Sequence, residues 1–378
     1  MNQLKIVVNT RMLLKNRLDG IGRYAYETLK RTVTLHKDVK FIFLFDREYS
    51  DEFVFGDNVT PIVLYPPTRH ALLNYIWFQF RVKYFLNKTK PDLFLSPDGI
   101  LCIGSKCKQL AVIHDLNFFH YPKDLPFSTS IFFNYYFPRY AKEATRIATV
   151  SLFTKKDLIK EYGVKPDKID ITYNGVDDSF CPINEEKKNA IKKIYTDNKN
   201  YFLFVGSIHP RKNITRLLKA FDLFKKDSNS DMKLVIAGSF FWGKKEIDAV
   251  LKKMNHKDDV IFTGRISDDS LKNLVPTAFC LSYVPYFEGF GVPLLEAMRS
   301  EIPIISANVT SMPEVAGNAA LYVDPFNIEE IKNAMEKIYT NKDLRNRLIE
   351  NGKKQSKKFS WDESAKSLWR SIERSIIE

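Results

Sequence analysis

The sequence predicts an α/β protein built from two doubly wound parallel sheets, and three observations point to this class. The chain has 378 residues, enough for about two domains. It is 44% hydrophobic and 27% charged, the proportions of a globular protein with a sizeable core. Short apolar runs alternate with amphipathic helical stretches along the chain, which is the pattern of βαβ units in parallel sheets.

The first half carries one such series. Its predicted strands are KIVVN, FIFLF, TPIVLY, DLFLS, LAVIHD, RIATVS and KIDITYN. Helices are predicted after Gly20, from about Ala71 to Leu86 and around Ser130 to Ala144, because apolar residues recur there at helical spacing. We expect a Rossmann-like domain over residues 1–180.

A polar stretch from about Asp178 to Asn200 interrupts the alternation of predicted strands and helices, and we place the domain boundary there. A second series of strands then follows: YFLFVG, KLVIAG, DVIFTG, AFCLSYV, IPIISA and AALYVD. This predicts a second Rossmann-like domain over residues 195–355, with a final helical segment over residues 356–378. Ligands of open α/β sheets bind beyond the carboxyl ends of the strands, so the residues after each strand are the candidates for function.

The segment EGFGVPLLEAM follows the predicted strand AFCLSYV. It places Glu288 in the loop and Glu296 about one turn into a helix that starts near Val292. Gly289 and Gly291 allow backbone N–H groups to approach a ligand closely, and the helix start favours an anion. The two carboxylates suit ligand hydroxyls. Two glutamates alone are weak evidence, since both can be solvated surface groups; the Gly-Phe-Gly-Val-Pro sequence between them favours a binding site.

A second candidate lies in FVGSIHPRKN, where Arg211 and Lys212 stand between a strand and the next helix. There they can neutralise a pyrophosphate, with Arg as a planar fork and Lys as a point charge. The alternative is that they are two of the chain's 58 basic residues.

Two further candidates lie in the first half. Gly20 and Gly22 form a short glycine-rich turn before a helix, but Ala25 replaces the third glycine of a dinucleotide fingerprint, which disfavours a dehydrogenase. His114 and Asp115 directly follow the strand LAVI, where a histidine can serve function, although a lone histidine is more often structural.

Several absences narrow the function. The sequence has no GxxxxGK[ST] loop, no GxSxG elbow and no Asp-x-Asp, so we expect no cofactor and no metal ion at the donor site. The four cysteines form no CxxC pair and are expected to be reduced. The N-terminus does not have the pattern of a signal peptide, and no apolar run is long enough to span a bilayer, so we expect a cytoplasmic protein.

Taken together, these segments resemble the retaining GT-B glycosyltransferases of glycosyltransferase family four, also called glycosyl transferases group 1. The resemblance spans nearly the whole chain. It includes, in the family's order, DGIGRYAYETL, VIHDL, TVSLFTKKDL, KIDITYNGVD, FVGSIHPRKN, FTGRISDD, EGFGVPLLEAM and SMPEVAGNAALYVDP. The GT-B resemblance implies that the two domains face a central cleft and that the last helix crosses back to the first domain.

The resemblance also implies roles for individual residues. Glu296 would hold the ribose and Glu288 would lie near the donor sugar; Arg211 and Lys212 would bind the pyrophosphate. Many members carry arginine where this chain has Ser207, which would shift more of the phosphate charge onto this basic pair. The remaining expected contacts are His114 near the donor sugar, Gly20 and Gly22 toward the phosphates, Gly264 and Arg265 beside the base, and backbone N–H groups of Phe290 and Gly291.

The resemblance implies a hexosyltransferase that retains anomeric configuration. The HPRKN form of the basic loop is similar to mannosyltransferase-like members, so GDP-mannose is the leading donor, with UDP-glucose, UDP-GlcNAc and dTDP-rhamnose left open. No carboxylate nucleophile is evident, which favours front-face attack. The implied pathway is the synthesis of a bacterial surface polysaccharide or lipopolysaccharide.

The acceptor is expected to be a saccharide or a lipid-linked saccharide held by the first domain. Leu73, Ile76, Trp77, Phe80 and Tyr84 recur at helical spacing near basic residues, which suits either the protein core, the favoured interpretation, or the inner face of a membrane. SIFFNYYFPRY is a second aromatic candidate for membrane contact.

Three alternatives remain. The net charge of +13 favours anionic partners and would also suit nucleic acid, but the basic residues are scattered without a recognition motif, so we expect no nucleic-acid partner. A phosphorylase should show a lysine for pyridoxal phosphate in a longer chain. A sugar-nucleotide epimerase of the same fold would need carboxylates near the sugar, which the sequence does not exclude.

Overall fold

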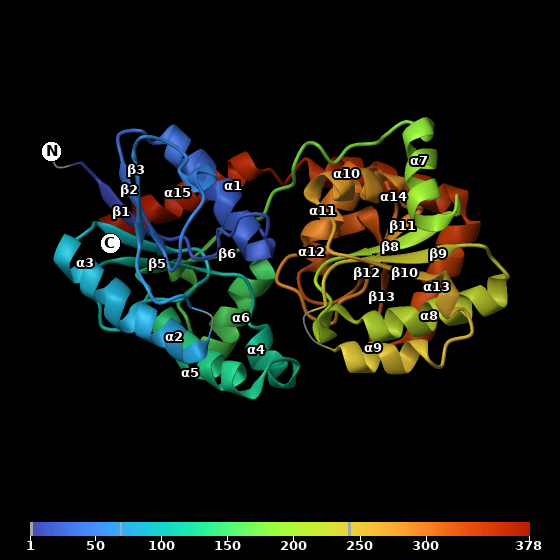
Figure 1. Ribbon diagram of the computed structural model, residues 1–378, viewed down its shortest axis with the longest axis horizontal. Helices are drawn as coiled ribbons and strands as arrows, with labels where there is room; N and C mark the ends of the chain where they lie inside the picture. Colours follow the sequence, from blue (N-terminus) through green and yellow to red (C-terminus); the bar gives the residue numbers. More distant parts are fainter. Residues whose placement is uncertain (1–2, 69, 241–242) are drawn as a thin grey trace. The chain divides into compact units, whose positions relative to one another are not determined.

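The computed structural model describes residues 3–68, 70–240 and 243–378. The chain divides into two compact units. The first comprises Met1–Gly175 together with Trp361–Glu378, and the second comprises Val176–Ser360. Each unit is a parallel sheet with helices packed against it, as Figure 1 shows.

The first unit holds a seven-stranded parallel sheet with the order β3-β2-β1-β4-β5-β6-β7. Its strands are β1 (Lys5–Asn9), β2 (Lys40–Phe45), β3 (Val59–Val63), β4 (Leu93–Ser96), β5 (Gln109–Ile113), β6 (Arg146–Thr149) and β7 (Ile169–Ile171). Its helices are α1 (Gly20–Leu35), α2 (Ala71–Ile76), α3 (Lys83–Thr89), α4 (Asn117–His120), α5 (Phe127–Glu143), α6 (Leu152–Tyr162) and α15 (Trp361–Ile377).

The second unit holds a six-stranded parallel sheet with the order β10-β9-β8-β11-β12-β13. Its strands are β8 (Tyr201–Val205), β9 (Lys233–Ala237), β10 (Val260–Gly264), β11 (Cys280–Tyr283), β12 (Ile304–Ala307) and β13 (Ala320–Val323). Its helices are α7 (Glu185–Thr196), α8 (Ile214–Ser228), α9 (Lys244–Leu251), α10 (Asp268–Thr277), α11 (Val292–Arg299), α12 (Met312–Ala316), α13 (Ile328–Thr340) and α14 (Lys342–Ser356).

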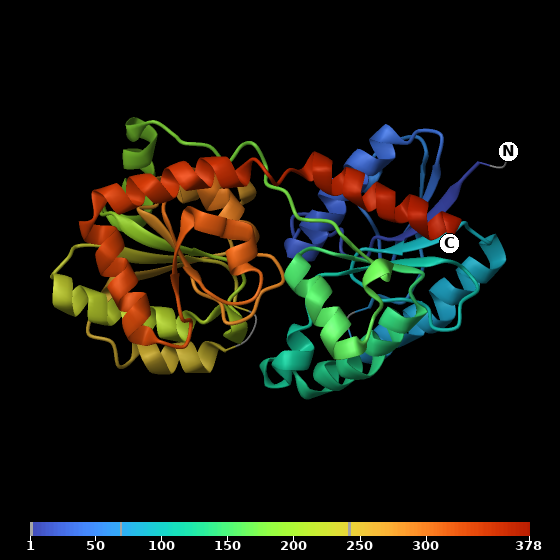
Figure 2. The ribbon, with the colours of Figure 1, turned by 180° about the vertical axis from the view of Figure 1, so that it is seen from behind.

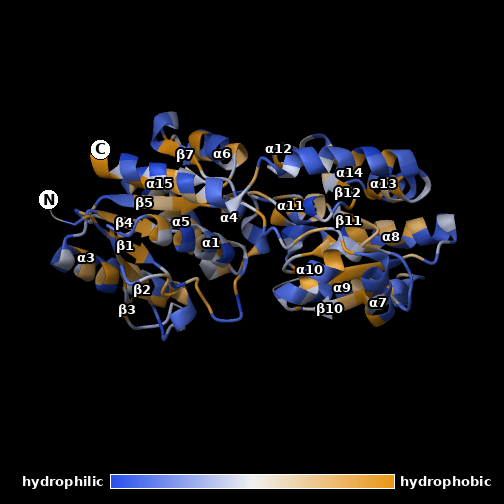
Figure 3. Cartoon of the chain, turned by 90° about the horizontal axis from the view of Figure 1, so that it is seen from above, coloured by the Kyte–Doolittle hydropathy of each residue, from blue (hydrophilic) through white to orange (hydrophobic). Residues whose placement is uncertain are grey.

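Both strand orders reverse direction beside the first strand of their sheet, as in doubly wound Rossmann-like folds. The predicted α/β class with two parallel sheets is confirmed. Figure 3 shows the polar residues gathered along the outer faces of helices such as α13, α14 and α15. That pattern is expected for amphipathic helices that cover an apolar sheet.

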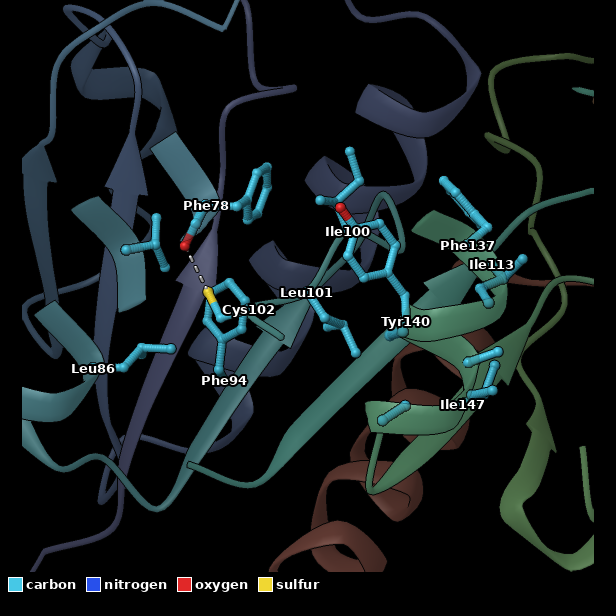
Figure 4. Packing of buried hydrophobic residues seen from close by; sticks show 14 of the residues in the cluster. Phe78, Leu86, Phe94, Ile100, Leu101, Cys102, Ile113, Phe137, Tyr140 and Ile147 are labelled. Atoms are coloured by element: carbon cyan, nitrogen blue, oxygen red, sulfur yellow. Dashed lines mark hydrogen bonds between the residues drawn. The ribbon is translucent and has the colours of Figure 1, made fainter. Parts of the chain in front are cut away.

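A cluster of buried apolar side chains forms the core of the first unit beneath α3 and α5, and Figure 4 shows 14 of its residues. Phe94 of β4 and Ile113 of β5 contribute from the sheet, and Tyr140 contributes from α5. Cys102 lies among them and donates its thiol to the carbonyl of Phe78 at 3.1 Å. Burial raises the pKa of the Cys102 thiol, so this cysteine remains protonated and serves the packing.

The predicted helix over residues 71–86 is not one regular helix. A π-helical segment, Trp77–Val82, separates α2 from α3. Within it, the Gln79 side chain donates to the carbonyl of Leu101 and accepts from the N–H of Ile103, both at 2.9 Å. The hydropathy pattern could not show this change, because the loop that binds Gln79 lies more than 20 residues further along the chain.

The polar stretch after residue 178 contains a helix that the sequence analysis did not identify. It is α7, whose N-cap Asn184 accepts from the N–H of Lys187 at 2.9 Å. Glu185 and Glu186 occupy its first turn, where the helix dipole favours negative charge. High polarity made this segment look like a linker, although its ends carry the signals of a helix.

The final helix, α15, belongs to the first unit. It packs against α1 and passes across β4, β5 and β6, and Figure 2 shows it lying along this sheet. Leu368 and Ile372 on its inner side are fully buried, and Arg31 of α1 pairs with Asp362 at 2.6 Å. The first unit therefore consists of two chain segments that meet only after the second unit has been traversed.

The packing of α15 gives a prediction. Leu368→Ala should lower the free energy of unfolding of the first unit by about 3 kcal/mol, because it removes a fully buried side chain and leaves a cavity. Ile377→Ala is the matched control, since its side chain is 84% exposed. Urea denaturation followed by circular dichroism measures both; equal effects would contradict the packing described.

Candidate active site

Glu288 lies in the turn between β11 and α11, and Glu296 lies on α11. Gly291 precedes the first residue of this helix with φ at 95°, a backbone conformation that favours glycine. A Cβ atom on Gly291 would also lie 2.6 Å from Cε of Met312. This glycine therefore allows the close turn that carries the chain from the Glu288 loop into α11.

Arg211 and Lys212 lie in the 3₁₀ turn Pro210–Lys212, which follows β8. Asn213 comes next with φ at 64°, and its side-chain nitrogen donates to the carbonyls of Val284 at 3.0 Å and Pro325 at 2.6 Å. The N–H of Tyr286 donates to the carbonyl of Arg211 at 3.0 Å. These bonds fasten the basic turn to the loop that carries Glu288 and to the loop after β13.

The basic pair and the first glutamate form one cluster. Arg211 Nη1 lies 2.6 Å from Glu288 Oε2, and Lys212 Nζ forms an ion pair with the same oxygen. Tyr283, the last residue of β11, donates its hydroxyl to Glu288 Oε2 at 3.1 Å, while Lys212 Nζ donates to the Tyr283 oxygen at 2.5 Å. Two segments more than 70 residues apart in the sequence thus meet at one carboxylate oxygen.

The electrostatics of the cluster follow from this geometry. Burial alone would raise the pKa of Glu288, but the charges of Arg211 and Lys212 outweigh it and lower this pKa to about 2. Burial raises the pKa of Tyr283, so its hydroxyl is neutral and able to donate. With two cations and one carboxylate, the cluster carries a net charge of about +1 at neutral pH.

The sequence analysis assigned Glu288 to ligand hydroxyls and the basic pair to phosphate, as separate contacts. The structure shows that the three side chains also bind one another. All the contacts described above use Oε2 of Glu288. Tyr283 and Asn213 were missed because only the folded chain brings them to the cluster, although Asn213 stands directly after the basic pair.

His209 begins the same turn. Its Nδ1 accepts from the N–H of Arg211 at 3.4 Å. Burial, followed by the nearby positive charges of Arg211 and Lys212, lowers the pKa of His209 to about 4. His209 is therefore neutral at physiological pH and adds no charge to the cluster.

The ends of β9 and β10 lie beside this turn. The N–H of Ile208 donates to the carbonyl of Ser239 at 2.8 Å, and the N–H of Gly238 donates to the carbonyl of Gly264 at 2.9 Å. Gly264 has open space where a side chain would project, and Arg265 after it is exposed. Glu296 is partly buried. Gly264 and Arg265 thus lie at the end of β10, whereas Glu296 lies on α11.

An aromatic pair stands at the same edge. Phe240 stacks on Phe262 with ring centroids 5.6 Å apart and an interplanar angle of 27°, and Lys244 Nζ lies 5.8 Å from the Phe240 ring. Phe240 remains 39% exposed. The sequence analysis missed this pair, although the aromatic residues directly after the strand KLVIAG were a signal for it.

In the first unit, α1 begins at Gly20 with Asp19 as its N-cap, whose carboxylate accepts from the N–H of Gly22 at 3.2 Å. A Cβ on Gly22 would meet the carbonyl oxygen of Met12 at 2.7 Å, whereas one on Gly20 would meet nothing within 4 Å. Gly22 is therefore required for packing, while Gly20 leaves space that a ligand can approach.

His114 directly follows β5. Its Nε2 lies 2.8 Å from the carbonyl oxygen of Pro97, which can only accept, so Nε2 carries the proton. Burial lowers the pKa of His114, and the ring is neutral at physiological pH. Asp115 accepts from the N–H of Asn117 at 3.0 Å and so shapes the following turn.

Two family models match this chain. The model for Glycosyltransferase Family 4 matches residues 18–180, and the model for Glycosyl transferases group 1 matches residues 185–355. Together they account for most of the chain. The protein belongs to this family of glycosyltransferases, and the prediction of a hexosyltransferase is confirmed at the level of enzyme class.

Curated relatives agree with the family. O-antigen chain mannosyltransferase B of Escherichia coli is 25% identical over 370 residues, covering 95% of this chain and 97% of the relative. O-antigen chain mannosyltransferase RfbU of Salmonella typhimurium is 30% identical over 230 residues, covering 61% of this chain and 60% of the relative.

Solved structures agree with the fold. HepE from Anabaena, in complex with UDP and glucose, has a TM-score of 0.76 at 13% identity, covering 98% of this chain and 100% of that chain. Sucrose-phosphate synthase from Thermosynechococcus elongatus has a TM-score of 0.77 at 16% identity, covering 98% of both chains. The fold is that of the GT-B glycosyltransferases.

The cluster around Glu288 gives a prediction about stability. Lys212→Met should lower the free energy of unfolding by about 2 kcal/mol, because it leaves a largely buried carboxylate with fewer partners. Adding Glu288→Gln to the same chain should restore part of this loss. Lys366→Met is the control, since its ion pair with Glu363 is exposed and should contribute under about 0.5 kcal/mol.

The difference in unfolding free energy between wild type and Lys212→Met depends on pH. The pKa of Glu288 is about 2 in the folded protein, below its usual value of about 4.3. The stability that the ionised carboxylate adds is therefore fully present above about pH 4.3. The contribution is lost as the pH falls toward 2. The difference between wild type and Lys212→Met in urea denaturation should therefore shrink below about pH 4; a difference that grows on acidification would contradict the ion pair.

Proposed function

We propose that this protein is a retaining glycosyltransferase that transfers a hexose from a nucleoside diphosphate sugar to a saccharide or lipid-linked saccharide. The proposed pathway is the synthesis of bacterial surface polysaccharide, in the cytoplasm and in part at the inner face of the membrane. The observation that carries the proposal is the cluster of Arg211, Lys212 and Glu288 at the carboxyl ends of β8 and β11.

The cluster suits a diphosphate. Its net charge of about +1, together with the N-terminus of α11, attracts an anion of two to three charges. In the proposal, Arg211 and Lys212 turn toward the phosphates when the donor binds and stabilise the charge that develops as the diphosphate leaves. Backbone N–H groups of Phe290, Gly291 and Val292 approach the same phosphates. The turn at Gly20 and Gly22 is a further candidate for phosphate contact. No metal ion is needed in this scheme.

The remaining donor contacts are assigned from position. Glu296 holds the ribose hydroxyls. Gly264 and Arg265 lie beside the base, and the exposed ring of Phe240 offers it a stacking surface. Glu288, with Gly289 after it, faces the sugar hydroxyls, where Oε1 is available because the contacts with Arg211, Lys212 and Tyr283 use Oε2.

The proposed chemistry is front-face attack. The acceptor hydroxyl oxygen forms a bond to the anomeric carbon on the side from which the diphosphate departs. The bond from that carbon to the phosphate oxygen breaks, and the departing phosphate takes the hydroxyl proton. Neutral His114 donates through Nε2 to Pro97, and we propose that the rest of its ring orients the donor sugar and acceptor.

GDP-mannose is the leading donor. The relatives named above are mannosyltransferases by name, which supports mannose, while HepE was solved with UDP and glucose, which supports testing uridine donors equally. The experiment is a thermal-shift and turnover panel of GDP-mannose, UDP-glucose, UDP-GlcNAc and dTDP-rhamnose, each with and without EDTA. A donor at about 100 times its dissociation constant should add roughly 2.7 kcal/mol of stability.

Variants decide whether the donor uses this site. Glu296→Ala should weaken binding of the stabilising nucleotide by about tenfold, because a ribose hydrogen bond to a charged group is lost, and Phe240→Ala should weaken it by a similar factor. Glu329→Ala, an exposed carboxylate on α13, is the control. Wild-type affinity in both variants would place the nucleotide elsewhere; donor turnover without any acceptor product would favour an epimerase.

The first unit also carries an aromatic surface that we propose contacts an anionic membrane. Across the described ranges, no helix is long and apolar enough to cross a bilayer. Trp77 is buried in the core, in agreement with the favoured interpretation, but other large apolar side chains on α2–α3 and α5 are exposed. These are Leu72, Phe80, Tyr84, Phe127, Ile131 and Tyr135.

The two helical segments meet, since Tyr75 and Tyr136 have ring centroids 5.6 Å apart. Arg81 and Lys88 are exposed on the first segment, and Arg139 lies over the ring of Tyr135 at 3.5 Å on the second. Exposed aromatic rings beside cationic groups suit the interface of a membrane rich in anionic lipid.

This surface gives a prediction. Phe80→Ser with Tyr84→Ser should reduce binding to vesicles containing phosphatidylglycerol by about tenfold. The two exposed aromatic side chains would otherwise be buried in the membrane interface. Leu35→Ser with Ile194→Ser removes equally exposed side chains elsewhere and should change nothing. Vesicle flotation measures both; equal binding by wild type and the Phe80/Tyr84 variant would exclude this surface.

A further inference from the structure

Tyr24 of α1 is fully buried and contacts His114. It also contacts the two places where the chain leaves the first unit and returns to it. Tyr24 lies on the first turns of α1 with no exposed surface. Its ring meets the His114 ring edge to face, with centroids 5.2 Å apart and an interplanar angle of 89°. His114, to which the proposed function assigns a role in the reaction, therefore packs against one aromatic ring.

The hydroxyl of Tyr24 connects to the first passage. It donates to Thr172 Oγ1 at 2.9 Å. Thr172 directly follows β7, and its N–H donates to the carbonyl of Thr149 at 2.7 Å. The first segment of this unit ends three residues later, at Gly175.

The ring of Tyr24 connects to the second passage. Its centroid lies 6.4 Å from that of Trp361, with an interplanar angle of 67°. Trp361 is the residue at which the chain re-enters this unit and begins α15, and it is buried. One side chain thus contacts the residue directly after β7, before the chain leaves this unit, and the first residue after it returns.

Two hydrogen bonds also hold His114. Its Nε2 is held by the carbonyl of Pro97, and its carbonyl accepts from Thr154 Oγ1 at 3.0 Å. These bonds fix one edge of the ring and its backbone, but the orientation of the ring plane also needs a packed face. Tyr24 supplies an aromatic contact of the edge-to-face kind, which is directional.

We infer that Tyr24 is a positioning residue: it fixes the plane of the His114 ring and ties that ring to both passages between the units. The inference rests on the proposed function of His114. A shift of either passage would then reach His114 through one rigid ring, so the geometry of the histidine would depend on the conformation of the linking segments.

The test breaks the hydrogen bond from both sides. Tyr24→Phe removes the donor and keeps the ring, and Thr172→Val removes the acceptor in a side chain of the same shape. Each should lower kcat by about tenfold, the size of one neutral hydrogen bond, while the KM for the donor changes by less than about threefold. The double variant should be no worse than either single variant. Thr172→Ser keeps the hydroxyl and should restore kcat.

Tyr201→Phe is the matched control. Tyr201 is equally buried and donates its hydroxyl to the carbonyl of Leu274 at 2.7 Å, at the amino end of β8. It should lower the melting temperature about as much as Tyr24→Phe and leave kcat unchanged. If Tyr201→Phe lowers kcat as well, the effect of Tyr24→Phe is one of general stability and the inference fails.

His114→Ala separates this inference from the proposed function. It should lower kcat, and Tyr24→Phe should have no further effect in its background. If His114→Ala lowers kcat but Tyr24→Phe and Thr172→Val do not, the positioning role fails and the role of His114 stands. If His114→Ala leaves kcat unchanged, the role of His114 fails and the inference fails with it.

Discussion

The ion pair between Glu288 and the basic turn is the interaction on which the second unit's site depends. A largely buried carboxylate is stable only with partners, and here Arg211, Lys212 and Tyr283 supply them. The contact joins the loop after β8 to the loop after β11, two neighbouring strands. It holds two flexible cationic side chains beside the start of α11. In the proposed function, these two side chains are then close at hand to stabilise the charge of a leaving diphosphate.

This arrangement follows from strand order. In both sheets the first strand lies between the second and the fourth, so the direction of winding reverses beside it. The loops after β8 and β11 therefore lie at a topological switch point, where ligands of open α/β sheets bind. In the first unit, His114 and the start of α1 lie at the corresponding edge, where Tyr24 joins them. Each unit thus carries its candidate site residues at the carboxyl edge of its sheet.

Sequence reasoning identified what depends on local pattern. Each expected strand is present, and Asp19 and Gly291 stand at the helix starts that the motifs predicted. It missed what depends on distant partners: the π-helical segment held by Gln79, and the direct pairing of Glu288 with Lys212. Neither can be seen in a single window, because the partners lie over 20 and over 70 residues away. The exposed Phe240 was missed for another reason, since apolar residues after a strand usually pack.

The placement of α15 has a consequence for the order in which the protein forms on the ribosome. The second unit is one continuous stretch, and every residue of it has been synthesised before Trp361. The first unit lacks the helix that covers β4, β5 and β6 until residues 361–377 have emerged. The first unit therefore begins to be synthesised first but is completed last. Its sheet keeps an uncovered apolar face while the second unit folds. Such exposed surface is where nascent chains recruit chaperones or aggregate.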